Sequence, residues 1–532
     1  MESDRPASTK PVSPRPKSSA SGTLRTPASY KLCDQISEGL IYLSVVFAPW
    51  AFGTTAEPET WILDAMCLLL GGALAAKWLI RWRTGYRPSR WSDPEPGRRG
   101  RIAAWTTRFL GMFTVAILLY CVLSALNARA TIDPGRGAFR YNPKYIPWLP
   151  HSYDYANTWV YTLHYLSFAC LFWSVRDWLL GKTSRERRFF LADPPGAVSA
   201  EVRQSLKANS EGDSRVPGEM PDRFRRLLWL LCINGSLLAL ESILQRLSGT
   251  PKLLWLRLPV WNTDESGQFG PYAYRSNAAQ YFNLIWPLCL GFWSILRKES
   301  RLRIGPGHRV GGSAHVILLP CSILLMAAPI ISTSRGGALV ALGGISLAIC
   351  VLLLANMRSG RAIRVGIMAW FLMVIGFSGY LGWDRLQLRL TQMVEDDSMS
   401  GRKEIYENSR EILKEHQTYG VGPGAFATVY KFYRKPGQVW HAWVHDDWLE
   451  LRLTFGMVGF SLILGAFLLV CSRWFASAGI LVPWEFTALC YVGILGCLAH
   501  AKYDFPLQVH SIAHCLLLCC SILCVTRKHG RA

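Results

Sequence analysis

Two histidines and two aspartates lie immediately before an unbroken apolar segment in the second half of the chain. The stretch reads HAWVHDDWLELRLTFGMVGF and runs from His441 to Phe460. Titratable side chains at the edge of a membrane are costly unless they are used, so this stretch is the first candidate for chemistry. A neutral histidine beside carboxylates can act as a general base towards a hydroxyl. Either histidine of this stretch could take this role, and we expect Asp446 and Asp447 to orient the ring.

Two other interpretations fit the same stretch. His441 and His445 would share one face of a helix, a geometry that can bind zinc, but HAWVH lacks a third ligand and the glutamate of the HExxH motif. Alternatively, Asp446 and Asp447 only cap the following helix, and the histidines lie in solvent. We predict no metal site and no cofactor, and we place His441 and Asp446 among the substrate-binding candidates.

A single arginine lies between two apolar segments in STSRGGAL. Arg335 has no acidic neighbour in the sequence, and Gly336 and Gly337 let another backbone or a substrate come close to it. The planar guanidinium suits bidentate contact with a phosphate. The alternative is an arginine that extends its side chain to lipid headgroups.

Apolar helices must position these residues. Half of the residues are apolar, aromatic residues make up 12%, and many windows of about 20 residues are nearly free of charge. We predict an all-α polytopic integral membrane protein with about twelve transmembrane helices. The windows are 36–53, 60–80, 103–126, 157–180, 227–247, 278–296, 314–332, 337–356, 365–383, 455–472, 484–500 and 506–525.

The basic residues follow a topological pattern. Runs such as RWRTGYRPSRW, RERRFF, RKESRLR and the terminal RKHGR lie in alternate connections, so the positive-inside rule puts both termini in the cytoplasm of a multi-pass inner-membrane protein. The net charge of +22 therefore does not indicate a nucleic-acid partner. The first 30 residues lack the apolar core of a signal peptide and are typical of a disordered tail.

Composition divides the chain into four parts. We expect a disordered cytoplasmic tail at 1–35, N-terminal transmembrane helices at 36–247 with a polar cytoplasmic loop near 182–223, a second membrane domain at 248–526, and a short cytoplasmic tail at 527–532. Most of the 15 cysteines lie in apolar segments without a CxxC pair, so we interpret them as small buried residues. Four of them lie in the last segment: Cys515, Cys519, Cys520 and Cys524.

The connection 384–454 is the largest of three long outward loops and is expected to carry short amphipathic helices. SGRKEIYENSREILKEHQ places Ile405, Ile412 and Leu413 near one helical face, with Ser400 at the start. AFATVYKFYRK forms a second amphipathic segment. Between them, the glycines of YGVGPGAF allow a tight turn, and the absence of a GK[ST] ending argues against a nucleotide-binding loop.

Ordered motifs from about 269 to 524 resemble the O-antigen ligase and O-antigen polymerase superfamily of bacterial envelope glycan enzymes. They are GPYAYRSNAAQYFNLIWPLCLG, STSRGGAL, GRKEIYENSREILKEH, YGVGPGAF, HDDWLELRLTFGMVGF and YDFPLQVHS. The ligase signature has His, then Asn, Ser or Gln, nine residues, Gly, two residues, and Gly, Thr or Tyr. Here His445 is followed by Asp446, nine residues, Gly456, two residues and Gly459, so the spacing matches and the second position departs.

The resemblance implies an inverting, metal-independent glycosyl transfer at the outer face of the cytoplasmic membrane, as in lipopolysaccharide and polysaccharide biosynthesis. The donor would be a glycan on undecaprenyl pyrophosphate, and the acceptor hydroxyl would belong to another glycan, lipid A core or a protein. In this scheme His445 is the general base, Arg335 and Arg402 bind the pyrophosphate, and Arg275 and Arg410 are further candidates.

Two alternative functions remain compatible with the sequence. About twelve spans with polar groups within them also fit a transporter or flippase of lipid-linked glycans, although transporters usually show two repeated halves and none is visible here. A protein O-oligosaccharyltransferase of the same superfamily would use a serine or threonine hydroxyl as acceptor. The residues do not separate a ligase from a polymerase or from this enzyme.

Overall fold

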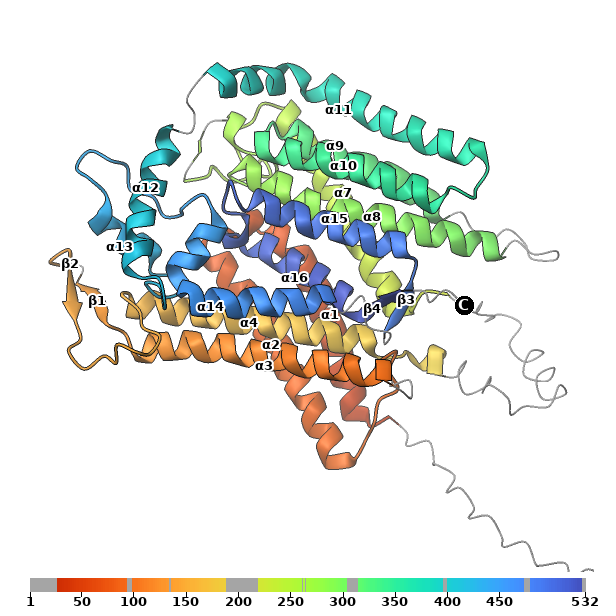
Figure 1. Ribbon diagram of the computed structural model, residues 1–532. Coiled ribbons are helices and arrows are strands. Elements are labelled where there is room, and N and C mark those ends of the chain that lie inside the picture. The colour runs from red at the N-terminus through yellow and green to blue at the C-terminus, as the bar shows by residue number, and fades with distance from the viewer. Residues whose placement is uncertain are drawn as a thin grey trace, which may run out of the picture.

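The computed structural model is an all-helical bundle with two very small sheets (Figure 1). It describes residues 26–92, 98–133, 135–187, 219–260, 262–263, 265–303, 314–395, 400–472 and 479–528. The expected tails at 1–35 and 527–532 and the expected loop near 182–223 lie largely outside these residues. Most helices run side by side, as apolar segments of this length do when they cross a membrane.

The described helices and strands occur in the following order. They are α1 (Ala28–Trp50), η1 (Phe52–Thr54), α2 (Glu57–Thr84), α3 (Arg98–Leu126), β1 (Ala130–Asp133), β2 (Ala138–Tyr141), α4 (Tyr155–Leu180), α7 (Asp222–Leu247), η2 (Glu265–Gly267), α8 (Arg275–Arg303), η3 (Ala314–Ile317), α9 (Leu318–Ile331), α10 (Arg335–Ala355), α11 (Arg361–Glu395), α12 (Ser400–Glu415), α13 (Phe426–Tyr433), α14 (Asp447–Ser472), β3 (Ile480–Val482), α15 (Trp484–His500), η5 (Pro506–Gln508), α16 (His510–Val525) and β4 (Thr526–Lys528).

Each of the twelve apolar windows falls on a described helix. Within the described residues, seven helices are long and apolar enough to cross a membrane, and α15 and α16 are shorter apolar helices. The fold is therefore that of an all-α polytopic membrane protein, whereas a count of twelve spans remains a prediction. The cysteines match their interpretation, because all are free thiols and most are buried.

Helix α8 forms the centre of the second membrane domain. Its residues from Ala278 to Leu290 are all buried, because α7, α9, α10 and α15 surround it. By contrast, α3, α10 and α11 expose large apolar side chains such as Leu119, Leu347 and Leu372. Such exposed apolar surface is expected where a helix faces lipid.

One end of the bundle carries most of the irregular structure, and we call it the site end (Figure 1, left). It holds the antiparallel hairpin of β1 and β2, in which Ala130 pairs with Tyr141, together with α12 and α13. The expected loop 384–454 is more helical than its sequence indicated. Helix α11 extends to Glu395, and α14 begins at Asp447.

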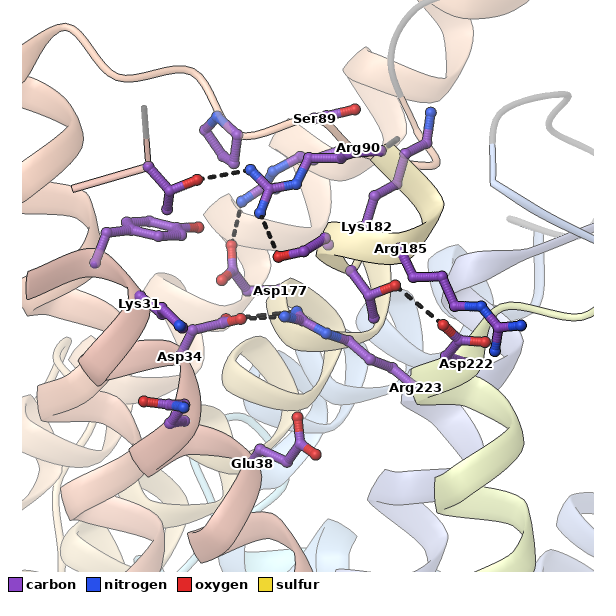
Figure 2. Close-up of a pocket in the computed structure, with 18 of the residues that line it drawn as sticks. Lys31, Asp34, Glu38, Ser89, Arg90, Asp177, Lys182, Arg185, Asp222 and Arg223 are labelled. Atoms are coloured by element: carbon purple, nitrogen blue, oxygen red, sulfur yellow. Dashed lines mark hydrogen bonds and ion pairs between the residues drawn. The ribbon is translucent and has the colours of Figure 1, made fainter. Parts of the chain in front are cut away.

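The opposite end of the bundle contains a cavity of about 550 Å³ between α1, α2, α4 and α7 (Figure 2). Charged residues line it and are heavily paired: Asp34 and Asp177 each lie 2.9 Å from the buried Lys77, and Arg223 also pairs with Asp34. Charges within a membrane protein are stable when they are paired in this way. This cavity lies away from the histidine stretch, and its ion pairs join the N-terminal helices to one another.

Candidate functional site

A glycine interrupts α14 eleven residues after His445 and fixes the path of the backbone there. Gly456 has φ +57° and ψ −168°, so the helix ladder breaks there. The freed groups pair with the glycine-rich turn: Val421 N donates to Leu453 O at 2.8 Å, and Met457 N donates to Gln417 O at 2.8 Å. A Cβ on Gly456 would lie 2.3 Å from Thr418 O. Gly456, the first glycine of the ligase-like spacing after His445, therefore cannot carry a Cβ, because the backbone of Thr418 lies against it.

The loop from 434 to 446 is not helical, so His441 and His445 do not share a helical face. His445 adopts φ +58°, a left-handed conformation that is strained for a residue other than glycine and is common at functional sites. Tyr406 of α12 donates a hydrogen bond of 3.0 Å to His445 O and holds this conformation. The two histidine rings are 6.2 Å apart between centroids.

Asp504, from the turn between α15 and α16, contacts the ring of His445. Its Oδ1 lies 3.3 Å from His445 Nδ1, and the side chains are 6% and 24% exposed. The ring also meets the edge of Phe505 at 4.8 Å between centroids. A carboxylate on Nδ1 leaves Nε2 as the basic nitrogen. His445 is therefore paired and oriented on one side and partly open on the other.

The two acidic neighbours of His445 do not orient its ring, which corrects the expectation from sequence. Asp446 caps α14 by accepting from Leu449 N at 3.0 Å, and it also pairs with Lys502. Asp447 accepts from Leu507 N at 2.8 Å and from the side chain of Gln508 at 3.2 Å. Asp447 thereby holds the 504–508 turn against the start of α14, which brings Asp504 to His445.

A buried hydrogen-bond network extends from Asp504 into α8. Ser276 Oγ donates to Asp504 Oδ2 at 2.6 Å and lies 3.0 Å from His500 Nε2, and His500 Nδ1 lies 2.9 Å from Gln280 Oε1. Tyr274 OH also donates to Asp504 Oδ2 at 3.2 Å. The network links α8, α15 and the 504–508 turn, so the carboxylate has little freedom to move.

The surroundings of Asp504 favour its ionised form. Burial alone would raise its pKa, but the hydrogen bonds from His445 and Ser276 and the nearby His500 and Arg402 outweigh burial and hold the pKa of Asp504 below its usual value. A carboxylate that stays ionised near neutral pH can stabilise a positive charge developing on His445.

Three predicted arginines adjoin this network. Arg402 of α12 donates to Tyr503 O, next to Asp504. Arg335 begins α10, and a Cβ on its neighbour Gly336 would lie 2.9 Å from His500 Nε2. Arg275 begins α8 beside Ser276 and donates to Ser266 O. Segments far apart in the sequence thus place these three arginines next to residues of the network, and Arg402 is the one whose charge acts on Asp504.

The remaining predicted residues are less central. Arg410 is exposed and lines a cavity of about 440 Å³ next to the site, together with Asp446, Arg452 and Lys502. His441 packs against Tyr430, with 6.2 Å between centroids. Burial and the neighbouring His445 lower the pKa of His441. Among the described residues, neither site histidine belongs to a group that could hold a metal ion.

Sequence reasoning missed the role of several residues. Asp504 lies in YDFPLQVHS, and Tyr274 and Ser276 lie in GPYAYRSN. The resemblance included both motifs, but it assigned no role to these three residues. His500 and Gln280 lie inside apolar segments and were not singled out. Their partners come from other helices, so no local spacing could reveal the network.

Residues 320–464 match the family described as O-antigen ligase. The chain therefore resembles the O-antigen ligase superfamily, as its ordered motifs predicted. No curated protein matches the chain. The O-antigen ligase match includes Arg335, Arg402 and His445 and supports a membrane glycosyltransferase of this general type. Asp504, His500 and Ser276 lie outside the matched segment and join the site only through the fold.

Proposed function

We propose that this protein is a glycosyltransferase of the O-antigen ligase type that transfers a glycan from a polyprenyl pyrophosphate, such as undecaprenyl pyrophosphate, to an acceptor hydroxyl. The observation that carries the proposal is the His445–Asp504 pair at the site end of the bundle, with Arg402 next to Asp504 and the start of α10, at Arg335, next to His500. The pair supplies a base, and the arginines supply positive charge for a pyrophosphate leaving group.

The proposed step is a single displacement with inversion. Nε2 of His445 accepts the proton of the acceptor hydroxyl while its oxygen bonds to the anomeric carbon. The bond from that carbon to the pyrophosphate oxygen breaks, and the polyprenyl pyrophosphate leaves with the electron pair. Asp504 stabilises the imidazolium, and the guanidinium groups stabilise the charge on the leaving group. The step uses no metal ion.

An apolar cavity beside the site supports a lipid-linked donor. It has a volume of about 290 Å³ and lies between α3, α4, α14 and α16. Asp447, Trp448 and Leu507 line it near the site, and the other lining residues are almost all apolar. An isoprenoid chain could lie there while its pyrophosphate reaches the arginines, because burial of apolar chain from water is favourable.

The base is tested with purified full-length protein, a polyprenyl-pyrophosphate-linked glycan and a range of glycan acceptors. We expect His445→Ala to lower the initial rate by about a hundred- to ten-thousandfold, the usual contribution of a positioned base. His441→Ala is the matched control and should cost much less. Near-normal transfer by folded His445→Ala protein would refute this mechanism, whereas the absence of transfer by the wild-type protein would favour a lipid-linked glycan carrier.

The leaving-group assignment is tested by arginine-to-lysine changes, which keep the charge and lose the planar fork. Arg335→Lys and Arg402→Lys should lower transfer substantially at an unchanged amount of folded protein. Arg410→Lys should be milder, because Arg410 is exposed and lies about two turns further along α12 than Arg402. Equal activity of all three variants would remove the arginines from the proposed step.

A further inference from the structure

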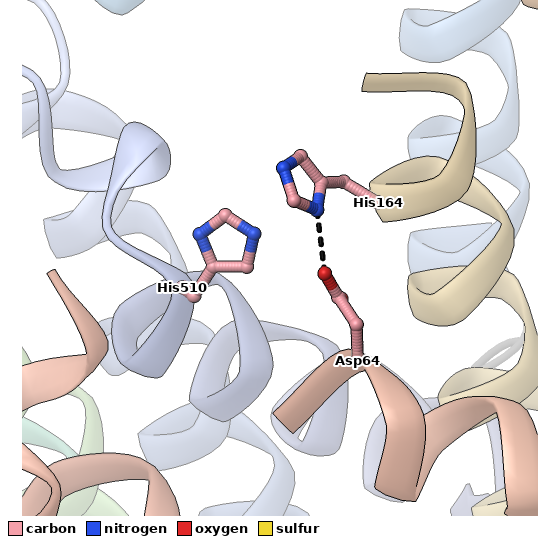
Figure 3. A group of neighbouring side chains, drawn as sticks. All are labelled: Asp64, His164 and His510. Carbon is pink, nitrogen blue, oxygen red and sulfur yellow. Dashed lines mark hydrogen bonds and ion pairs between the residues drawn. The ribbon is translucent and has the colours of Figure 1, made fainter. Parts of the chain in front are cut away.

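Three metal-ligating side chains meet between the N-terminal helices and α16, apart from the His445 site (Figure 3). Asp64 comes from α2, His164 from α4 and His510 from the start of α16. One ligand atom from each lies within 4.8 Å of the others. His164 Nδ1 is 2.5 Å from Asp64 Oδ2, and the two imidazole centroids are 4.5 Å apart.

The carboxylate of this cluster is buried without a lysine or arginine among its described contacts. Asp64 is 1% exposed, and its hydrogen bonds come from His164 and from Ser167 Oγ. A buried carboxylate needs a positive partner or a proton to offset its loss of hydration. Among the described contacts of Asp64, only an imidazole could carry a positive charge. A bound cation is the alternative source of that charge.

A second observation indicates that a ligand is missing from this arrangement. Nε2 of His510 is buried and has no hydrogen-bond partner. Figure 3 shows the His510 ring directing a nitrogen towards Asp64 and His164. Trp61, Tyr161 and Phe168 pack around the imidazoles. A buried polar nitrogen with no partner is destabilising, and coordination of a cation would remove that cost.

We propose that Asp64, His164 and His510 bind one divalent transition-metal ion, for which zinc fits best. Two imidazoles and one carboxylate are a common zinc ligand set, and they leave a fourth position for water. In a tetrahedral site with ligands at about 2.1 Å, two ligand atoms lie about 3.4 Å apart, so the most widely separated pair must close by up to about 1.4 Å and the Asp64–His164 pair must open by about 0.9 Å. Side-chain rotation can supply that movement.

The ion would act as a clamp between the two halves of the molecule. His510 follows the 504–508 turn directly, and that turn carries Asp504 and is held by Asp447. Coordination would tie this turn to α2 and α4, whose role the sequence motifs leave open. None of the three ligands contacts His445, so the clamp supports the position of Asp504 and takes no part in the reaction.

Metal content tests the proposal on the full-length protein in detergent. After equilibration with zinc and dialysis into metal-free buffer, we expect about one zinc ion per chain by elemental analysis. Asp64→Asn and His510→Ala should each lose it, whereas His441→Ala should retain it. Absence of bound zinc in the wild type, or full retention in both ligand variants, would overturn the proposal.

Two further measurements remain informative if a variant folds poorly. Cobalt in the wild-type protein should give the intense visible bands of a four-coordinate site, and zinc should abolish them by displacement. Zinc should also raise the unfolding temperature of the wild type. Only weak octahedral cobalt bands would refute the site. These readouts do not depend on glycosyl transfer, so they separate this proposal from the proposed function.

Discussion

Asp504 is the residue on which the orientation of the His445 ring depends. It lies 59 positions further along the chain than His445, and its carboxylate lies 3.3 Å from His445 Nδ1. The adjacent Asp446 instead pairs with Lys502 and caps the start of α14. The pair resembles the base–carboxylate arrangement that fixes the tautomer of catalytic histidines. At the residue scale, contact in space therefore outweighs proximity in sequence.

Asp504→Asn should separate orientation from simple acidity near the histidine. The amide keeps the shape and loses the charge that stabilises the imidazolium, so we expect the transfer rate to fall by about a hundredfold or more. Asp446→Asn removes an equal charge next to His445 but off its ring, and should change the rate only a few-fold. Initial rates at matched amounts of folded protein measure this, and equal losses would contradict the assignment.

At the scale of elements, the break in α14 and the glycine-rich turn form one unit. The turn donates and accepts backbone hydrogen bonds at the break, and Gly420 and Gly456 approach so closely that neither tolerates a Cβ. The amphipathic helices α12 and α13 then pack on this unit through Ile405, Ile412 and Phe426. Together, the break, the turn and these two helices fix the backbone of the loop that carries His445.

Gly456→Ala should weaken this unit. The substitution combines a left-handed φ with a Cβ placed 2.3 Å from Thr418 O, so we expect a loss of roughly 1–3 kcal/mol or more in the free energy of unfolding. Gly343→Ala in α10 is the control, because a Cβ there meets nothing within 4 Å and alanine favours a helix. Thermal unfolding in detergent compares the two variants, and equal stability would show that the break is not strained.

The pH dependence of stability should report on the packing of α12 against the chain before α4. Burial lowers the pKa of His416 from 6.5 to about 4, and its ring packs on Tyr153 at 5.1 Å between centroids. Between these values the unfolded chain binds more protons, so the contribution is complete above about pH 6.5 and is lost as the pH falls towards 4. His416→Gln should flatten the unfolding temperature over this range, and an unchanged slope would refute the linkage.

At the scale of the whole molecule, the helices bring the site together from segments that span most of the second half of the chain. The charge pattern places the site end outside the cytoplasm, and this orientation remains a prediction. Val439 is a good probe of it because its side chain is 68% exposed, whereas the side chain of Gln438 is bound by Asn408.

Val439→Cys should react with an impermeant maleimide in intact cells whose outer membrane has been made permeable. Arg358→Cys, in the connection between α10 and α11 at the opposite end, should react only after the inner membrane is broken. The exposed native Cys350 is first replaced by alanine. The reverse labelling pattern would invert the topology and remove the site from the outer face.

The sequence by itself determined the class of fold and the amphipathic helices, and it predicted His445 as the candidate base. Apolar windows and helical periodicity depend on neighbouring residues. Local patterns are therefore enough to predict α12 from Ser400 and the two apolar helices on either side of the turn at Arg335. The ordered motifs likewise predicted the O-antigen ligase resemblance. Local patterns could not predict the left-handed conformation of His445.

Only the tertiary structure decided which groups act on His445 and which residues gather elsewhere. Asp504, Ser276 and His500 meet because Asp447 holds the 504–508 turn and α8 packs against α15. The Asp64 cluster likewise combines helices separated by hundreds of residues. Such contacts depend on how helices pack side by side, and that packing is set by the shape of whole apolar faces, which no short motif contains.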